Sequence, residues 1–419
     1  MHTGRPSRTA STLRTPRRAL SMRVLFFAEG ATLAHLARPL VLAGQAARFG
    51  HEAILAAPPA YAWALSAFAG ETRPLTAIAP AEFARRLAQG EPLYDYALLR
   101  DYVEADRALM RELRPDHVVG DFRLSLAVSA RLEGVPYTAL ANAYWSPYYA
   151  IRRWPVPELP LTRRLPLALA AALFRFARPL AFRVHARPMA RLLAAFRQPG
   201  IGHDLRRVYT EADLTLYADP PALFPLEAAP RSHRFIGPIT WAPPVPVPPW
   251  WHELPEDRPL AYVTLGSSGR AALAGTLAEA LVDAGFRVML ATAGAVTVPP
   301  SPCVHIADFL PGEAAARRAR LVICNGGSPT SHQALLAGRP VLGLPSNLDQ
   351  FLNMQALEAA GLGFTLRADR ATPAAVRAAA LSLADEPAQE RARRFAVGLT
   401  VDGAVQSFYG LIRELRSTR

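Results

Sequence analysis

A glycine-containing turn in the C-terminal half of the sequence has residue types that suit binding of a diphosphate. Residues 324–331 read Cys-Asn-Gly-Gly-Ser-Pro-Thr-Ser and lead from an apolar stretch into a helix expected at 332–337. Gly326 and Gly327 let the backbone approach a ligand closely, and Ser328 is suited to cap the helix. A diphosphate would bind the free N–H groups at the positive end of that helix. An ordinary strand-to-helix turn uses the same residue types, so the turn alone leaves both interpretations open.

An acid and an amide stand together further along the chain. The stretch 340–344 is typical of a buried strand, and the polar segment that follows it contains Asp349 and Gln350. Each sugar hydroxyl is both a donor and an acceptor, and two adjacent hydroxyls match the two polar atoms of a carboxylate or carboxamide. The pair is therefore a candidate for binding a sugar. An aspartate that only caps a helix is the alternative.

These segments belong to a repeating pattern of strands and helices. The apolar run 23–28 is typical of a strand buried on both faces, and it is followed by a helix expected at 34–49 and a second strand at 51–57. Strands expected at 116–121 and 135–140 extend the same parallel sheet. The pattern restarts in the C-terminal half, with strands expected at 260–265, 287–291, 321–324 and 340–344.

A proline-rich segment separates the two sets of units. Residues 239–256 hold too many prolines for a helix or a central strand, so we interpret them as a linker. The expected organisation is an extension at 1–21 that is disordered or not native, a domain at 22–238, the linker, and a domain at 257–400. The predicted fold class is α/β, with two Rossmann-like, doubly wound domains facing a central cleft.

The order of these features resembles a known family. A Gly-Gly turn, a helix, Gly-Arg-Pro-Val at 338–341 and then Asp-Gln are similar to the donor signature of the UDP-glycosyltransferase superfamily, whose architecture is called GT-B. The similarity extends over nearly the whole chain from Met22. It implies that residues 22–238 bind an acceptor and that residues 257–400 bind a nucleotide-sugar donor. It also implies that a helix in 401–419 packs back on the N-terminal domain.

The resemblance implies which residues contact the donor. The glycine turn would hold the diphosphate, the loop after the first strand of the donor domain would approach the phosphates, and the acid and amide would bind the sugar. A third segment would flank the nucleobase. The expected donor-binding residues are Gly266, Ser267, Ser268, Phe309, Leu310, Asn325, Gly326, Gly327, Ser328, Asp349 and Gln350.

One position departs from the family pattern. Asn325 stands before the two glycines, where most family members have histidine. Histidine can place a positive charge against a diphosphate, whereas an amide donates a neutral hydrogen bond that is roughly half as strong. The helix dipole and the backbone amides remain, so we expect phosphate binding to persist.

The resemblance also implies a general base. His35 lies at the junction of the first strand and the first helix, where family members carry a histidine that removes the proton of the acceptor hydroxyl. Imidazole suits this task because its ordinary pKa is near neutrality. Asp121 matches the partner aspartate, which would orient the imidazole and stabilise its protonated form. For His35 alone, a structural histidine is the alternative.

The expected acceptor region is aromatic and basic. Trp145 and Tyr148, with Tyr149 beside them, are candidate stacking surfaces for an acceptor. Residues 159–203 contain no acid but many arginines among leucine, alanine and phenylalanine. Such a segment fits either peripheral contact with an anionic membrane or a solvated helix over the acceptor pocket.

Composition limits the remaining possibilities. The net charge is +13, but no nucleic-acid module accompanies it. The 2 cysteines lack metal-ligand spacing and favour a reducing compartment, so we expect a cytoplasmic protein, with possible contact at the inner face of a membrane. No metal ion and no cofactor are expected besides the nucleotide-sugar co-substrate, because the helix dipole and hydrogen bonds would stabilise the diphosphate.

The sequence therefore predicts an inverting, metal-independent glycosyltransferase that moves a sugar from a UDP or TDP donor to a hydroxyl of an apolar small-molecule or lipid acceptor. Two alternatives stay open. One is a nucleotide-sugar epimerase of the same fold, which would need no acceptor pocket. The other is a non-catalytic relative that activates a partner enzyme, an interpretation that Asn325 keeps open.

Overall fold

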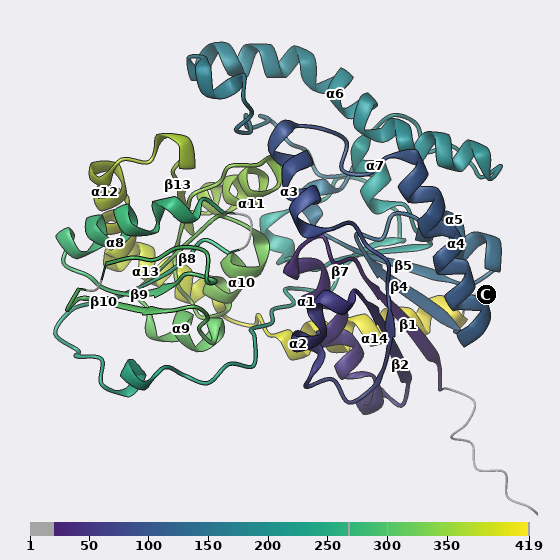
Figure 1. Cartoon of the computed structure of the whole chain (residues 1–419), viewed down its shortest axis with the longest axis horizontal. Helices are drawn as coiled ribbons and strands as arrows, with labels where there is room; N and C mark the ends of the chain where they lie inside the picture. The colour runs from purple at the N-terminus through teal and green to yellow at the C-terminus, as the bar shows by residue number, and fades with distance from the viewer. Residues whose placement is uncertain (1–20, 267–268, 300, 418–419) are drawn as a thin grey trace, which may run out of the picture.

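Apolar runs of the N-terminal half form a seven-stranded parallel sheet in the computed structural model, which describes residues 21–266, 269–299 and 301–417 (Figure 1). The strand order is β3-β2-β1-β4-β5-β6-β7. Residues of β1 are buried on both sides of the sheet, as expected for a strand covered by two layers of helices. The strands are β1 (Arg23–Ala28), β2 (Glu52–Ala57), β3 (Glu71–Pro74), β4 (His117–Asp121), β5 (Tyr137–Ala141), β6 (Leu214–Tyr217) and β7 (His233–Phe235).

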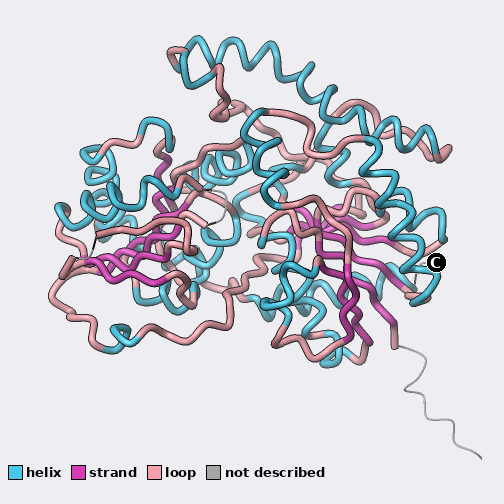
Figure 2. Tube along the Cα trace, viewed as in Figure 1, coloured by secondary structure: helices cyan, strands magenta, loops and turns pink. Residues whose placement is uncertain are grey.

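A second parallel sheet forms the C-terminal half. It has six strands in the order β10-β9-β8-β11-β12-β13. The two sheets lie in separate lobes (Figure 2), so the prediction of two doubly wound domains is confirmed. The strands are β8 (Leu260–Thr264), β9 (Arg287–Ala291), β10 (Val304–Ala307), β11 (Leu321–Cys324), β12 (Val341–Gly343) and β13 (Gly363–Thr365).

Helices cover both faces of each sheet. Leu25 and Phe27 point into a core shared with α4, α5, α6 and α7, whereas Val24 and Phe26 point into a core shared with α1 and α14. The helices are α1 (Leu33–Gly44), α2 (Ala62–Leu65), α3 (Pro80–Gln89), α4 (Tyr96–Leu113), α5 (Leu126–Glu133), α6 (Leu167–Ala195), α7 (Leu205–Thr210), α8 (Ala274–Asp283), α9 (Gly312–Arg318), α10 (Ser328–Leu336), α11 (Leu348–Ala359), α12 (Pro373–Ala384), α13 (Glu386–Ala396) and α14 (Val401–Ser417).

The proline-rich segment crosses from one core to the other. Ile239 is buried with the N-terminal sheet, and Trp251 is buried with the C-terminal sheet. Between them, the Gln333 amide of α10 donates to the Trp241 carbonyl over 2.8 Å. The chain therefore passes between the lobes in an extended form that is held at both ends.

The last helix returns to the N-terminal lobe. Phe408 lies 6.0 Å from Phe26 of β1, measured between ring centroids, and the Tyr409 hydroxyl donates to the Leu42 carbonyl of α1 over 2.6 Å (Figure 1). The stretch Glu386–Arg416 contains an 18-residue window whose mean hydropathy, 1.3, reaches that of a membrane-crossing helix. Because Phe408 and Ile412 are buried against the sheet, we assign α14 to the core of the lobe.

Removing one aromatic ring should loosen this attachment. Phe408→Ala deletes a fully buried side chain, so we expect unfolding free energy to fall by about 3–5 kcal/mol. Ser407→Ala, on the exposed side of the same helix, should change it by no more than about 0.5 kcal/mol. Urea denaturation followed by circular dichroism measures both. Equal stability of the two variants would contradict the packing of α14 on β1.

Candidate active site

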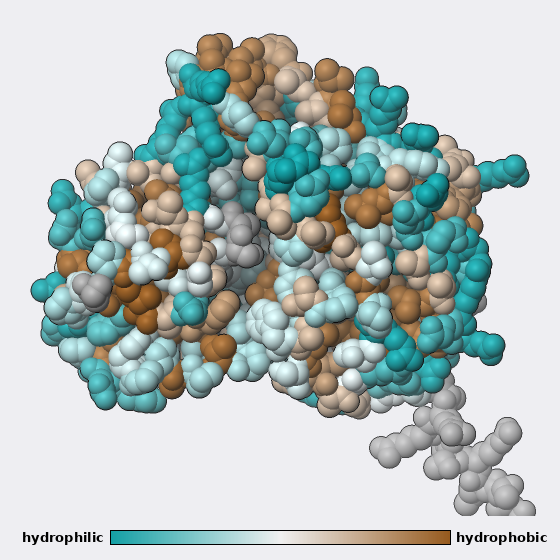
Figure 3. All heavy atoms as spheres, in the orientation of Figure 1, coloured by the Kyte–Doolittle hydropathy of each residue, from teal (hydrophilic) through white to brown (hydrophobic). Residues whose placement is uncertain are grey.

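Several predicted site residues lie at the ends of the strands where the strand order of each sheet reverses. This point falls between β1 and β4 in the N-terminal sheet and between β8 and β11 in the C-terminal sheet. Ligands of doubly wound sheets bind at the carboxyl ends of the strands at such points. Figure 3 shows the surface indented between the two lobes. The structure therefore places the two halves of the candidate site on facing lobes.

His35 and Asp121 form a hydrogen-bonded pair. His35 lies in the first turn of α1, directly after β1, and Asp121 is the last residue of β4. The imidazole Nδ1 is 2.9 Å from a carboxylate oxygen of Asp121. The His35 side chain keeps 18% of its surface exposed, whereas Asp121 is fully buried. The geometry leaves the imidazole accessible and its partner shielded from water.

Arg38 is a third member of this group that the sequence reasoning missed. Its guanidinium donates two hydrogen bonds to Asp121, of 2.6 and 2.7 Å. A carboxylate held in this bidentate way only accepts hydrogen bonds, so Nδ1 of His35 must be the donor. The unprotonated Nε2 is then the basic atom. The spacing of three residues between His35 and Arg38 on one helix was the available signal.

Phe122 is a second residue that the sequence reasoning missed. Its ring stacks on the His35 imidazole with centroids 4.7 Å apart and planes 10° apart. Its φ is 58°, in the left-handed region that β-carbon-bearing residues rarely adopt. Such backbone strain is retained where the surrounding structure enforces it, commonly at functional sites. The strained turn directs Asp121 and Phe122 toward the same imidazole.

A polar network continues from Arg38 to the other lobe. Arg38 donates to the Asn142 side chain, and Asn142 donates to Asp219 over 2.8 Å. His332 of α10 lies 3.5 Å from Asp219. Burial raises the pKa of Asp219 to about 6, and burial together with the charge of Arg38 lowers the pKa of His332 to about 3. The polar network of the His35 pair therefore extends to Asp219, which lies next to His332 of α10, the helix that follows the glycine turn.

The glycine turn before α10 contains a position where the backbone conformation and the packing exclude other residues. Gly326 has a φ of 81°, and a β-carbon there would lie 2.6 Å from Met354 Cγ, so this position requires glycine. The helix cap differs from the prediction. Gly327 is the N-cap residue and Ser328 is already helical, so Ser328 does not cap α10 with its side chain.

Asn325 lies between the two candidate phosphate loops. Its side-chain oxygen accepts from the Gly327 N–H over 3.0 Å. Its amide nitrogen would lie 3.5 Å from a β-carbon at Gly266, which has a φ of 60°. Ser267 and Ser268, also predicted for this loop, lie outside the described residues. Asn325 therefore orders the turn and brings a neutral donor to the Gly266 loop.

Asp349 lies at the contact between the lobes. Its carboxylate accepts from the Trp145 indole over 2.7 Å and from the Tyr144 hydroxyl over 3.2 Å. Burial raises the pKa of Asp349, while the hydrogen bond from Trp145 and the proximity of His35 act in the opposite direction. The indole N–H of Trp145 is thus bound to the predicted sugar-binding acid, and a stacking role of its ring stays a prediction.

Gln350 has a structural task that the sequence did not indicate. Its carboxamide oxygen accepts from the backbone N–H groups of Ser346 and Asn347, and the Asn347 side chain accepts from the Gln350 N–H. This is a capping box at the start of α11. The expectation that both polar atoms of Gln350 face a sugar is therefore corrected, because the oxygen is directed to the helix terminus.

Tyr148 lines a cavity of about 560 Å³ beneath α6. Trp154, Arg178 and Phe182 line the same cavity, and Phe182 lies 6.5 Å from Trp145, measured between ring centroids. An aromatic surface therefore leads from the Asp349 region toward α6.

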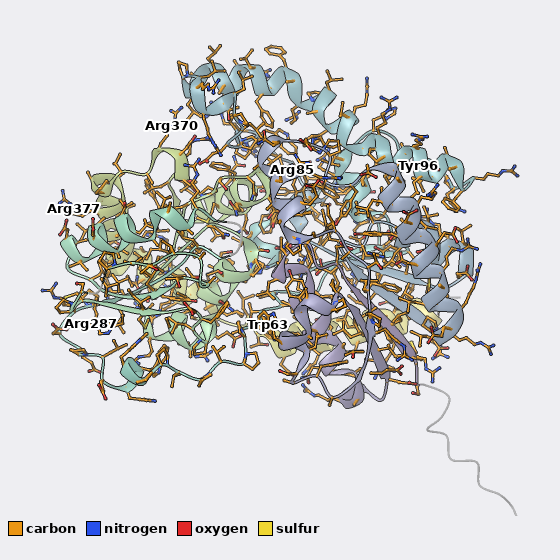
Figure 4. All side chains as sticks on the ribbon, viewed as in Figure 1. Trp63, Arg85, Tyr96, Arg287, Arg370 and Arg377 are labelled. Atoms are coloured by element: carbon orange, nitrogen blue, oxygen red, sulfur yellow. The ribbon has the colours of Figure 1, made fainter. Side chains whose placement is uncertain are left out.

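Of the two residues predicted to contact the nucleobase, only Phe309 has an exposed side chain. Phe309 is 42% exposed and lies 6.2 Å from Trp63 of the opposite lobe, which is labelled in Figure 4. Leu310 is only 3% exposed and belongs to the C-terminal core. The expectation of a side-chain contact from Leu310 to a base is therefore corrected. In the described part of the chain, no group of three or more histidine, cysteine, aspartate or glutamate side chains could hold a metal ion.

Fold and site together define a GT-B glycosyltransferase, and comparisons with known proteins agree. The family "Erythromycin biosynthesis protein CIII-like, C-terminal domain" matches residues 280–402. A "PGL/p-HBAD biosynthesis glycosyltransferase" of Mycobacterium tuberculosis is 45% identical over 388 residues, which are 92% of this chain and 90% of that protein. A "PGL/p-HBAD biosynthesis rhamnosyltransferase" of Mycobacterium bovis is 44% identical over 349 residues, which are 83% of this chain and 77% of that protein.

Solved structures share the architecture. The glycotransferase of kitacinnamycin has a TM-score of 0.70 at 20% identity, covering 94% of this chain and 98% of that one. The Streptomyces sp. SF2575 glycosyltransferase SsfS6, complexed with thymidine diphosphate, has a TM-score of 0.64 at 18% identity, covering 94% of this chain and 99% of that one. The chain belongs to the GT-B family of nucleotide-sugar glycosyltransferases, and it is a glycosyltransferase.

The glycine turn gives a stability prediction with a matched control. Gly326→Ala places a β-carbon at a positive φ and against Met354, so we expect the unfolding free energy to fall by about 3 kcal/mol or more. Gly398→Ala meets a φ of 82° but nothing within 4 Å, so it should cost only about 1 kcal/mol. Chemical denaturation measures both variants. Similar losses would show that the approach of Met354 does not constrain the turn.

His332 gives a pH prediction. Its folded-state pKa of about 3 lies below the ordinary 6.5, so the unfolded chain binds a proton that the folded chain refuses as pH falls. This costs the wild type about 1.4 kcal/mol per pH unit below 6.5. His332→Gln lacks that cost, so its unfolding free energy should rise relative to that of the wild type as pH falls from about 7 to about 5. Asp219, whose raised pKa has the opposite effect, is present in both proteins. A pH-independent difference in urea denaturation would contradict the prediction.

Proposed function

We propose that the chain transfers a sugar from a TDP-linked donor to a hydroxyl of an apolar acceptor, with inversion at the anomeric carbon and without a metal ion. One observation carries the proposal. The imidazole of His35 is held at Nδ1 by a buried carboxylate that Arg38 fixes, on the lobe facing the glycine turn. This arrangement suits a base that removes a proton on one side of the donor while a diphosphate leaves on the other.

The chemistry follows from these positions. Nε2 of His35 takes the proton of the acceptor hydroxyl as its oxygen forms a bond to the anomeric carbon. The bond from that carbon to the β-phosphate oxygen breaks, and the electron pair leaves with the nucleoside diphosphate. Asp121 stabilises the imidazolium, and the N-terminus of α10 stabilises the diphosphate charge. Attack from the side opposite the leaving group inverts the configuration.

Two findings support the choice of donor. SsfS6, a structural neighbour, was solved with thymidine diphosphate, and one relative is named a rhamnosyltransferase. Asp349 already accepts hydrogen bonds from Trp145 and Tyr144, so each of its oxygens has one fewer site for sugar hydroxyls. A deoxysugar such as rhamnose, which has fewer hydroxyls than glucose, fits this reduced capacity. We therefore propose TDP-rhamnose as the first donor to test.

The acceptor is proposed from the lining of the cavity. Tyr148, Trp154 and Phe182 give it an aromatic wall, which suits an apolar molecule. The curated relatives are named for PGL/p-HBAD biosynthesis. We propose an acceptor of that pathway type, presented with its hydroxyl toward His35.

The test is product formation from TDP-sugars and an apolar acceptor pool, read by mass spectrometry, with the anomeric configuration read by NMR. His35→Ala should lower kcat/KM by about 10²- to 10⁴-fold while TDP binding persists. His252→Ala, an exposed histidine outside the site, should match the wild type. Chelator should leave the rate unchanged.

Three outcomes would contradict the proposal. If His35→Ala transfers sugar at the wild-type rate, His35 is not the general base. Epimerised donor formed without any acceptor would indicate the epimerase alternative. Donor binding with no turnover on any acceptor in the pool would indicate the non-catalytic alternative.

A further inference from the structure

Helix α6 carries an apolar stripe that the body of the protein does not cover. Leu169, Leu173, Phe176, Leu180 and Val184 are spaced by four, three, four and four residues, so they share one side of the helix. All five are exposed, Phe176 at 80% and Leu180 at 64%. With Leu161 and Leu167 nearby, this segment holds 7 of the 13 exposed large apolar side chains among the described residues.

The stripe is accompanied by positive charge. Arg187 follows Val184 by three residues on the same side of α6, and Arg175 and Arg183 are exposed beside the apolar residues. No acidic residue occurs between Glu158 and Asp204. An uncompensated run of arginines next to exposed leucine and phenylalanine is complementary to a surface that is both apolar and anionic.

The helix is fixed above both lobes. Its C-terminal half packs on α4 of the N-terminal lobe through Met189 and Leu193. Just before its N-terminal end, the Leu165 carbonyl accepts from Arg370 of the C-terminal lobe over 3.1 Å, and Figure 4 labels that arginine. The stripe therefore lies on the outer side of a bridge between the lobes, where Figure 3 shows apolar atoms at the surface.

The segment leading to α6 reinforces this position. Glu158 pairs with Arg270 at 2.7 Å, and its carboxylate also accepts from the Asp369 N–H over 2.7 Å. The Val156 carbonyl accepts from Arg367 over 2.5 Å. These contacts tie residues 156–165, which belong to the N-terminal half of the sequence, to the C-terminal lobe, so that α6 presents one fixed face.

We infer that the exposed face of α6 docks the enzyme on an anionic lipid bilayer. The arginines interrupt the apolar run, so α6 lies in the headgroup boundary with its axis along the surface and does not cross the membrane. The long arginine side chains reach phosphate groups while the stripe enters the acyl boundary. Docking is separate from turnover, although it suits the apolar acceptor of the proposed function.

The docking face leads into the enzyme. Arg178 of α6 lies over the Trp154 ring at 4.6 Å, and both residues line the 560 Å³ cavity with Phe182. The same helix thus carries the membrane face and one wall of the cavity.

Vesicle flotation of the full-length protein tests the inference. The probes are vesicles of phosphatidylcholine alone and vesicles that also contain phosphatidylglycerol. We expect binding to the anionic vesicles and at least about tenfold weaker binding to the neutral ones. Leu173→Glu/Phe176→Glu/Leu180→Glu should lower binding to anionic vesicles by at least about tenfold. Arg183→Gln/Arg187→Gln should lower it by roughly fivefold for each charge removed.

The control variant places two glutamates on exposed apolar positions elsewhere. Leu381→Glu/Val397→Glu changes exposed apolar residues outside α6 and should float with the vesicles like the wild type. Thermal denaturation confirms that each variant is folded, since the changed side chains are exposed. Turnover of a short soluble acceptor should be equal in the wild type and the triple variant. If the wild type does not glycosylate this acceptor, that result counts against the proposed function. The flotation result still tests membrane docking.

Several results would overturn the inference. If the triple variant floats as well as the wild type, the stripe does not make the membrane contact. A wild type that never floats but forms a dimer in sedimentation velocity, abolished in the triple variant, would assign the stripe to a second copy of the chain. Equal binding to neutral and anionic vesicles would remove the role of the arginines.

Discussion

The buried carboxylate of Asp121 is the constraint on which the rest of the candidate site depends. Burying a carboxylate away from water costs free energy unless its oxygens accept hydrogen bonds. Here Arg38 donates two hydrogen bonds to Asp121, and His35 donates a third. These bonds fix which imidazole nitrogen carries the proton. The strained turn at Phe122 continues the same arrangement, because its ring packs against the imidazole that Asp121 orients. The chemistry of the N-terminal lobe is therefore set before any substrate binds.

The two lobes are joined by polar contacts at the site itself. Asp349 of the C-terminal lobe accepts from Trp145 of the N-terminal lobe, and Asp219 lies close to His332 of α10. A sugar that reached Asp349 would meet an acid already oriented by the acceptor-side lobe. In the proposed function, binding of the donor and positioning of the acceptor would be coupled through these side chains, as expected for enzymes that close around a substrate.

Much of this organisation was predictable from the sequence. Apolar strands ending in small or polar residues indicated the two sheets, and the Gly326 segment was predictable as a strand-to-helix turn, although Gly327 and not Ser328 is the N-cap residue. The pairing of His35 with Asp121 was implied by the family resemblance, and the structure has His35 after β1 and Asp121 at the end of the neighbouring β4. The contacts of Arg38 with Asp121 and of Trp145 with Asp349 depend on tertiary distances that no local pattern encodes. The interpretation of Gln350 as a sugar-binding side chain was wrong for its oxygen, because the same residue types serve both a capping box and a sugar site.

The most direct test of the account is the protonation of His35, measured by NMR of protein labelled with nitrogen-15 in its histidines. We predict that in the neutral imidazole Nδ1 carries the proton and Nε2 does not, and that Asp121→Asn disturbs this preference. A His35 with its proton on Nε2 in the wild type would contradict the account, since no basic nitrogen would then face the acceptor.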